Sequence, residues 1–176
     1  MRKFLFAFIL AASSVVTCFA QSTGSSSNVG KFSIGFDVAL PTGDYSNLYK
    51  PGLGGSLKYE IPAGQNLFVT LSGGYMNFSI KDEVVAALQE FGSDQTSAGF
   101  VPLKIGAKYY TSPGFFIEGQ LGGAIGTASG TGTAFAYSPG VGYTFDGGPE
   151  IGVRYEGWSK DGSTFSQFGL RLAYRF

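Results

Sequence analysis

The chain ends in the stretch LRLAYRF, residues 170–176, and this stretch separates two kinds of fold. Successive side chains of an extended strand point to opposite faces. One face carries Leu170, Leu172, Tyr174 and Phe176, whereas the other carries Arg171 and Arg175. A soluble β-sandwich would bury the apolar face and hydrate the arginines. A barrel that spans a membrane would do the reverse, so the rest of the chain must decide.

The same alternation of apolar and polar residues recurs upstream of the last strand. It is found in KFSIGFDVAL (31–40), GLGGSLKYEI (52–61), NLFVTLSGGYMNF (66–78), FVPLKIGAKYY (100–110), FFIEGQLGGAI (115–125), AFAYSPGVGYTF (134–145) and PEIGVRYEGW (149–158). Together with the terminal stretch, this predicts about eight strands of ~10 residues, the length and the number of strands in small transmembrane barrels. We therefore predict an all-β fold, an eight-stranded antiparallel up-and-down transmembrane β-barrel.

The volume of the side chains predicts which face meets lipid. Most strands carry four or five Phe, Tyr, Leu, Ile or Val residues on one face. The interior of a barrel of about eight strands is only just filled by ordinary side chains, so these large residues would not fit inside. We expect them to face outward and to form an apolar band, with Gly, Ala, Ser, Thr and charged residues enclosed.

The connections between the expected strands alternate in length. PAGQN (62–66), TSPG (111–114) and DGG (146–148) are short and rich in turn-forming residues. PTGDYSNLYKPG (41–52), SIKDEVVAALQEFGSDQTSAG (79–99), GTASGTGT (126–133) and SKDGST (159–164) are predicted to be longer loops. Short periplasmic turns and longer extracellular loops are typical of outer-membrane barrels.

The amino-terminal segment predicts export. Residues 1–20 contain Arg2 and Lys3, an apolar run and a small-residue stretch that ends at Ala20, which is the pattern of a signal peptide. Residues 21–30 are Ser/Gly-rich and are interpreted as a flexible tether, and residues 31–176 as the barrel domain. A competing interpretation takes VVTC as a lipoprotein box with Cys18 acylated, although Thr17 fits that box poorly.

Composition argues against several classes of function. Only 14% of the residues are charged and the net charge is zero, so nothing indicates nucleic-acid binding. The chain contains no histidine, which removes the usual general base near neutral pH. The single cysteine, Cys18, lies in the segment predicted to be removed. We expect no catalysis, no metal site and no cofactor.

Charged residues on the inward faces are the first candidate site. They are Asp37, Lys58, Glu60, Lys104, Lys108, Glu118, Glu150, Arg154, Glu156, Arg171 and Arg175. Both signs are present in near balance, and buried charges need partners, so a lumenal network of ion pairs is the first interpretation. The alternative is an ion path in which these charges set selectivity.

Aromatic residues near the strand ends are the second candidate site. We expect an interfacial girdle that contains Tyr59, Tyr109, Phe115, Tyr143, Phe145 and Trp158. Amphipathic rings favour headgroup depth in a bilayer, which is the physical basis of such girdles.

The chain resembles the small outer-membrane β-barrel proteins of the OmpX/OmpA-transmembrane-domain type and the porin-like barrel domains common in Bacteroidetes. The residues that carry this resemblance are ALPTGDYSNLYKPGLGG (39–55), GYMNF (74–78), VPLKIGAKYY (101–110) and the last strand. The resemblance implies the outer membrane of a Gram-negative bacterium, with contacts to lipid and lipopolysaccharide. It also implies that the barrel-assembly machinery recognises the last strand, with Tyr174 and Phe176 as its signal, and it implies no particular activity.

Three functions are therefore open. The first is a role in membrane structure or in surface interaction with an unknown ligand through the extracellular loops, and the second is a narrow passive channel. The third is a soluble, lipocalin-like carrier. Residues 82–91 carry the one helical signature, which we interpret as a lid over the barrel mouth or as a docking surface. The 41–52 loop could hold a ligand through Asp44, Tyr45 and Tyr49.

Overall fold

A computed structural model describes residues 29–90, 92, 94–128 and 130–176. The predicted signal peptide, the alternative acylation site at Cys18 and most of the predicted tether lie outside the described residues. The elements are β1 (Lys31–Pro41), η1 (Gly43–Asn47), β2 (Gly52–Pro62), β3 (Leu67–Ser79), α2 (Asp82–Glu90), β4 (Ser97–Tyr110), β5 (Phe115–Gly126), β6 (Thr133–Thr144), β7 (Pro149–Lys160) and β8 (Ser163–Arg175).

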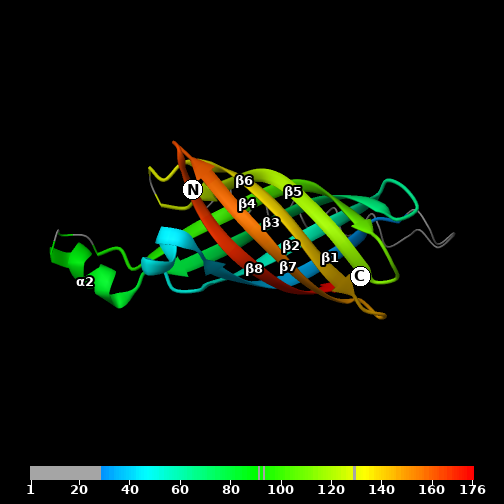
Figure 1. Cartoon of the computed structure of the whole chain (residues 1–176), viewed down its shortest axis with the longest axis horizontal. Helices are drawn as coiled ribbons and strands as arrows, with labels where there is room; N and C mark the ends of the chain where they lie inside the picture. The colour runs from blue at the N-terminus through cyan, green and yellow to red at the C-terminus, as the bar shows by residue number, and fades with distance from the viewer. Residues whose placement is uncertain (1–28, 91, 93, 129) are drawn as a thin grey trace, which may run out of the picture.

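The eight strands form one closed antiparallel barrel in sequence order (Figure 1). Each strand pairs with its neighbours in the chain, and β8 closes the barrel on β1 with Asp37 opposite Arg171 and Ser33 opposite Arg175. The predicted fold class is confirmed. Closure also leaves no exposed strand edge, as a bilayer requires of a sheet.

None of the helices in the described part of the chain is long and apolar enough to cross a membrane.

The two ends of the barrel differ as the sequence predicts, with one exception. Three tight connections, 63–66, 111–114 and 145–148, lie at one end, which we call the short-turn end. The longer connections 42–51, 80–96 and 127–132 lie at the other, the long-loop end. The expectation of a longer loop at 159–164 is wrong. Here β7 and β8 are joined through Asp161 (φ 49°) and Gly162 (φ 81°), because an Asp-Gly pair with positive φ at both residues forms a two-residue hairpin turn.

The apolar rows of the strands face outward, as the volume argument predicts. Ile105 and Leu121 are each 55% exposed, and Phe36 is 51% exposed. Inward positions of the same strands are closed to solvent, since Lys108 is 0% and Asp37 2% exposed. This distribution is the reverse of that in a soluble protein, so the outer surface is built for hydrocarbon.

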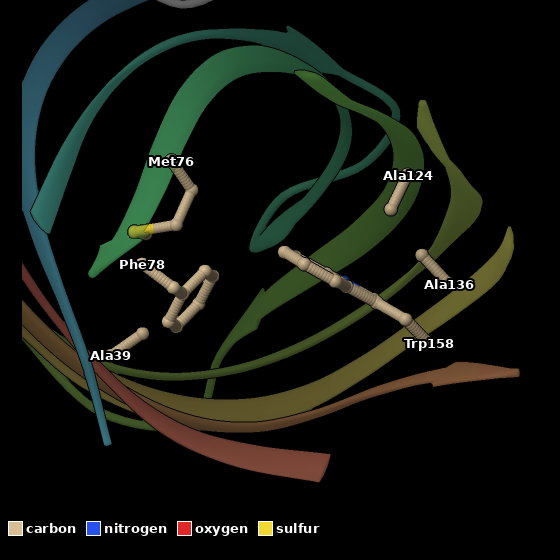
Figure 2. Packing of buried hydrophobic residues seen from close by; sticks show 6 residues of the cluster. All are labelled: Ala39, Met76, Phe78, Ala124, Ala136 and Trp158. Carbon is tan, nitrogen blue, oxygen red and sulfur yellow. The ribbon is translucent and has the colours of Figure 1, made fainter. Parts of the chain in front are cut away.

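Glycine makes room inside for large side chains at both ends of the barrel. A Cβ atom on Gly52 would lie 2.4 Å from a ring carbon of Phe78, and one on Gly142 would lie 2.3 Å from a ring carbon of Phe116. Phe78 and Phe116 are 0% and 2% exposed, so each ring packs directly on a glycine backbone inside the barrel. Figure 2 shows Phe78 and Trp158 pointing into the space that the strands enclose.

Helix α2 stands away from the barrel. Figure 1 shows it at the far tip of the connection between β3 and β4, and none of its residues is buried. The interpretation of this helix as a lid over the mouth is therefore wrong. Phe91, the last residue of the predicted helical segment, lies outside the described residues. The 42–51 loop covers the mouth instead, because Tyr49 pairs with Ile80 and the Lys81 amide donates to the Leu48 carbonyl at 3.0 Å.

Candidate functional site: the filled lumen and the loop face

The eleven predicted inward charges all lie in ion pairs, in two groups. The group nearer the long-loop end is centred on Glu156 and Arg154. Glu156 accepts from Lys104 Nζ at 2.9 Å and from Arg154 Nε at 2.8 Å. Arg154 also donates from Nη1 to Asp37 Oδ1 at 2.9 Å. Arg154 and Glu156 meet because residues two apart on a strand share a face.

The second group lies nearer the short-turn end and is centred on Lys108. Its ammonium group contacts Glu60 Oε1 at 2.7 Å and Glu150 Oε2 at 2.5 Å. The other members pair around these three residues: Lys58 with Glu118 at 2.6 Å, Arg171 with Glu150 at 3.3 Å, and Arg175 with Glu60 at 2.9 Å. Strands far apart in the sequence are thereby bridged across the lumen.

A serine joins the two groups. Ser56 donates to Asp37 Oδ2 at 2.5 Å and accepts from Arg171 Nε at 3.0 Å. The polar interior is thus one connected network of charged and hydroxyl groups. Breaking a buried ion pair by removing one partner typically costs about 3–5 kcal/mol, because the other charge stays buried and unpaired. The network therefore connects strands that are not neighbours in the sheet, such as β2 with β5 through Lys58 and Glu118.

An aromatic plug fills the lumen at the long-loop end. We use this name for Phe78, Phe100, Trp158 and Phe165 together with Tyr45 and Tyr49 of the covering loop. Ring centroids are 4.8 Å apart for Phe100 and Trp158 and 5.1 Å apart for Phe78 and Phe165. Tyr49 stacks edge-on against Phe165 at 5.7 Å. Such pairs stabilise by about 0.5–1.5 kcal/mol beyond their burial.

Tyr49 of the 42–51 loop packs in the plug as a neutral side chain. Burial raises the pKa of Tyr49 above its ordinary value, and neighbouring Tyr45 raises this pKa further. Tyr49 therefore keeps its phenol proton at any ordinary pH, which suits a ring that packs on Phe78 and Phe165. The expected role of Asp44, Tyr45 and Tyr49 in holding a ligand is not what this geometry favours, since both tyrosine rings face the plug.

The assignment of Trp158 to the interfacial girdle is wrong. Trp158 is only 3% exposed, and its indole N–H donates to Glu156 Oε1 at 2.8 Å inside the barrel. The physical reason is strand parity, since residue 158 lies on the same face as Arg154 and Glu156. The alternation that predicts the inward position of those charges also predicts an inward position for Trp158.

Four of the other girdle candidates point outward near the short-turn end. Tyr109, Phe115, Tyr143 and Phe145 are 45%, 39%, 40% and 51% exposed, and Tyr59 lies half-buried on the same outer surface. The rings of Tyr143 and Phe145 meet at 4.8 Å. Tyr174 and Phe176 also face outward, with ring centroids 5.0 Å apart. The Phe176 amide donates to the Phe32 carbonyl at 2.7 Å, so the chain end is tied to β1.

Three further aromatic residues, Phe68, Tyr110 and Phe116, line the lumen near the short-turn end, on the strand faces opposite to those of the girdle. Phe116 lies under Lys108, whose Nζ is 3.9 Å from the ring centroid. The guanidinium of Arg175 lies 5.5 Å from the Phe68 ring and 5.8 Å from the Tyr110 ring. These cation–π contacts supplement the ion pairs of the same two basic residues.

A small cavity remains at the centre. Its volume is about 50 Å³, and the groups around it include Asp37, Lys58, Ser72, Lys104, Ser138 and Arg171. The hydroxyl groups of Ser72 and Ser138 are buried and have no hydrogen-bond partner in the described structure. Across the described residues no cluster of His, Cys, Asp and Glu has the form of a metal site.

Comparison with known proteins identifies the family of the chain. Residues 8–176 match the family model described as the outer membrane protein beta-barrel domain. The chain belongs to this family. No match was found among curated proteins. Family membership indicates the bacterial outer membrane and, with the outward apolar band, excludes the soluble-carrier interpretation.

Solved barrels of similar shape agree with this placement. Ail of Yersinia pestis, solved in complex with the heparin analogue sucrose octasulfate, is 20% identical with a TM-score of 0.59, covering 84% of this chain and 97% of that one. Neisserial surface protein A is 14% identical with a TM-score of 0.53, covering 83% and 95%. The N-terminal barrel domain of Pseudomonas aeruginosa OprF is 14% identical with a TM-score of 0.52, covering 85% and 100%. At these identities the likeness establishes the fold alone.

Proposed function

We propose that this protein is a non-conducting, non-enzymatic outer-membrane barrel that acts in membrane structure or in surface interaction through its outer loops. The observation that supports the proposal is the filled lumen. Phe78 and Trp158, at 0% and 3% exposure, close the long-loop end, and the ion-pair network fills the centre below them. A passive channel needs a continuous aqueous path, and an eight-stranded barrel leaves little space for one.

Planar-bilayer recording tests this proposal against the narrow channel. The refolded wild-type barrel is expected to give no conductance steps at ordinary ionic strength. Steps that change in size with Arg154→Ala or Glu118→Ala would instead support an ion path through the network. Phe78→Ala serves as a comparison, because it removes plug volume and leaves every ion pair in place.

The absence of catalysis is part of the proposal. The sequence contains no histidine, so the usual general base is missing. The inward carboxylates that could otherwise act as acids or bases are held by basic partners, as Glu150 is by Lys108 and Arg171. Hydrolysis assays of the refolded protein with lipid, ester and peptide substrates are expected to show no turnover above a heat-denatured control.

The charge of the loops at the long-loop end indicates which kind of surface partner the protein would bind. The acidic residues beyond the strands at the long-loop end are Asp44, Asp82, Glu83, Glu90, Asp94 and Asp161. The basic residues there are Lys50 and Lys81, and Lys160 lies at the end of β7. Ail was solved with a sulfated sugar, but a surplus of carboxylates would repel such a ligand here. A basic partner that meets the exposed helix α2 is the better fit.

A binding comparison tests the charge argument. The refolded barrel is expected to bind a lysine-rich amphipathic peptide in low salt and to bind sucrose octasulfate weakly or not at all. Asp82→Lys with Glu83→Lys should reduce peptide binding, because both side chains are exposed in the first turn of α2. Preference of the wild-type protein for the sulfated sugar would contradict this part of the proposal.

Export and insertion complete the proposal. Residues 1–20 would direct export and be removed, and residues 21–30 would form a tether. Contacts with lipid and lipopolysaccharide would follow from the apolar band. The barrel-assembly machinery would recognise Tyr174 of β8 and Phe176, which directly follows that strand. Deletion of Phe176 is expected to lower the amount of folded barrel in the outer membrane, measured by heat-modifiable migration, while synthesis and export stay unchanged.

A further inference from the structure

We infer that the central cavity binds one small monovalent anion of the size of chloride. The cavity lies inside the ion-pair network, with a volume of about 50 Å³. A buried water needs roughly 10–15 Å³ of such space, so the cavity has room for a halide with a few waters. The inference concerns the interior and does not depend on which partner the loops bind.

The carboxylates around the cavity have no free oxygen to offer a guest. Asp37 accepts from Arg154 and Ser56. Glu118 accepts from Lys58 on one oxygen and from Gln120 on the other. Glu150 accepts from Arg171 on Oε1 and from Lys108 and Thr144 on Oε2. Every carboxylate oxygen around the cavity is therefore already engaged by a donor, which disfavours a cation here.

Hydrogen-bond donors, in contrast, remain unused. Ser72 lies directly between Lys58 on β2 and Lys104 on β4, as the strand registers show. Its buried hydroxyl has no partner in the described structure, and neither has that of Ser138, which is 3% exposed. Among the described residues, Lys104 pairs with Glu156 alone, and Arg154 pairs with the same carboxylate. Two hydroxyl groups and a lysine ammonium group are thus available to the same cavity.

The balance of charge favours the same occupant. The lumenal network contains the six basic side chains Lys58, Lys104, Lys108, Arg154, Arg171 and Arg175. It contains the five acidic side chains Asp37, Glu60, Glu118, Glu150 and Glu156. Since an uncompensated buried charge is costly, one bound monovalent anion would restore neutrality in the interior.

Crystallography with a heavier halide tests the site directly. The protein is refolded and crystallised in sodium bromide, so that bromide is present while the lumen forms. Anomalous scattering at the bromine edge is expected to show one peak in the cavity, within contact distance of Ser72 Oγ and Lys104 Nζ. Density that refines as water, with no anomalous peak, would overturn the inference.

Thermal unfolding gives a second, independent readout. At about five times its dissociation constant, chloride should raise the unfolding midpoint by about 2–4 °C over gluconate at equal ionic strength. Lys104→Met should abolish this difference, and the matched control Lys160→Met, on an exposed lysine outside the cavity, should keep it. Should Lys104→Met fail to fold, Ser72→Ala removes a donor without removing a charge. Equal midpoints of the wild-type protein in both salts would also overturn the inference.

Discussion

Trp158 donates its indole N–H to Glu156 Oε1 across 2.8 Å, and this bond joins the aromatic plug to the ion-pair network. Glu156 also accepts from Lys104 and Arg154, so a single carboxylate holds one aromatic and two basic side chains. The hydrocarbon part of the interior and its charged part therefore share an anchor. Because the two parts are bonded together, changes in either should be felt in the other.

The position of Trp158 predicts its fluorescence. It is the single tryptophan in the sequence, so the emission of the protein reports on this site alone. We expect little quenching by lipids brominated in their acyl chains, because the indole lies inside the barrel and not at the lipid surface. Tyr143→Trp in a Trp158→Phe background is the matched control, since Tyr143 is 40% exposed on the outer face. Strong quenching of the wild-type tryptophan would contradict the inward position.

Glu150 should be among the most sensitive positions for stability. It is 4% exposed and contacts Lys108 and Arg171, so Glu150→Gln leaves two buried basic groups short of a counter-charge. We expect a loss of about 3–5 kcal/mol in the free energy of unfolding, measured by urea titration in detergent. Asp82→Asn removes the partner of Lys50 in an exposed pair and should change little. Equal effects of both variants would argue against a structural role for the network.

The barrel fold could be predicted from the sequence because the same pattern is repeated in every strand. Alternation with a period of two, strand length and side-chain volume all point to the same closed sheet, and each strand supplies them again. The inward charges followed from that alternation. Their pairing could not be predicted, because Lys58 reaches Glu118 and Arg154 reaches Asp37 across the lumen, and which strands face each other depends on the register of the closed barrel.

The aromatic residues show where this approach fails. The prediction that places Trp158 in the girdle rests on its position near a strand end, although its parity along the strand places it inside the barrel. The face of the strand on which a side chain lies decides whether it meets lipid or the lumen, whatever its depth along the strand. The interpretation of helix α2 as a lid is wrong for another reason. An apolar stripe indicates an amphipathic helix, but it does not indicate which surface, if any, packs against that stripe.

The outer face should tolerate charge poorly in its middle and well beyond the strands. Ile105 is 55% exposed on β4 and faces the apolar band, so Ile105→Arg should cost about 2–4 kcal/mol of folding free energy in a bilayer. Leu48 is 40% exposed in the loop at the barrel mouth, and Leu48→Arg should cost far less. Folding efficiency into lipid vesicles measures both. If the two variants fold equally well, the assignment of this surface to hydrocarbon is wrong.

Two glycines, one on β1 and one on β5, should respond in opposite ways to the same substitution. A Cβ on Gly35 would lie 2.7 Å from Arg171 Nε, so Gly35→Ala must displace a guanidinium that bonds to Ser33, Ser56 and Glu150. We expect a loss of about 1–3 kcal/mol from overpacking of this kind. A Cβ on Gly119 meets nothing within 4 Å, and there Gly119→Ala should be neutral or stabilise by up to about 1 kcal/mol, because alanine restricts the unfolded chain. Urea unfolding of the two single variants measures both changes. If Gly35→Ala leaves the free energy of unfolding unchanged, the guanidinium of Arg171 is not packed tightly against β1.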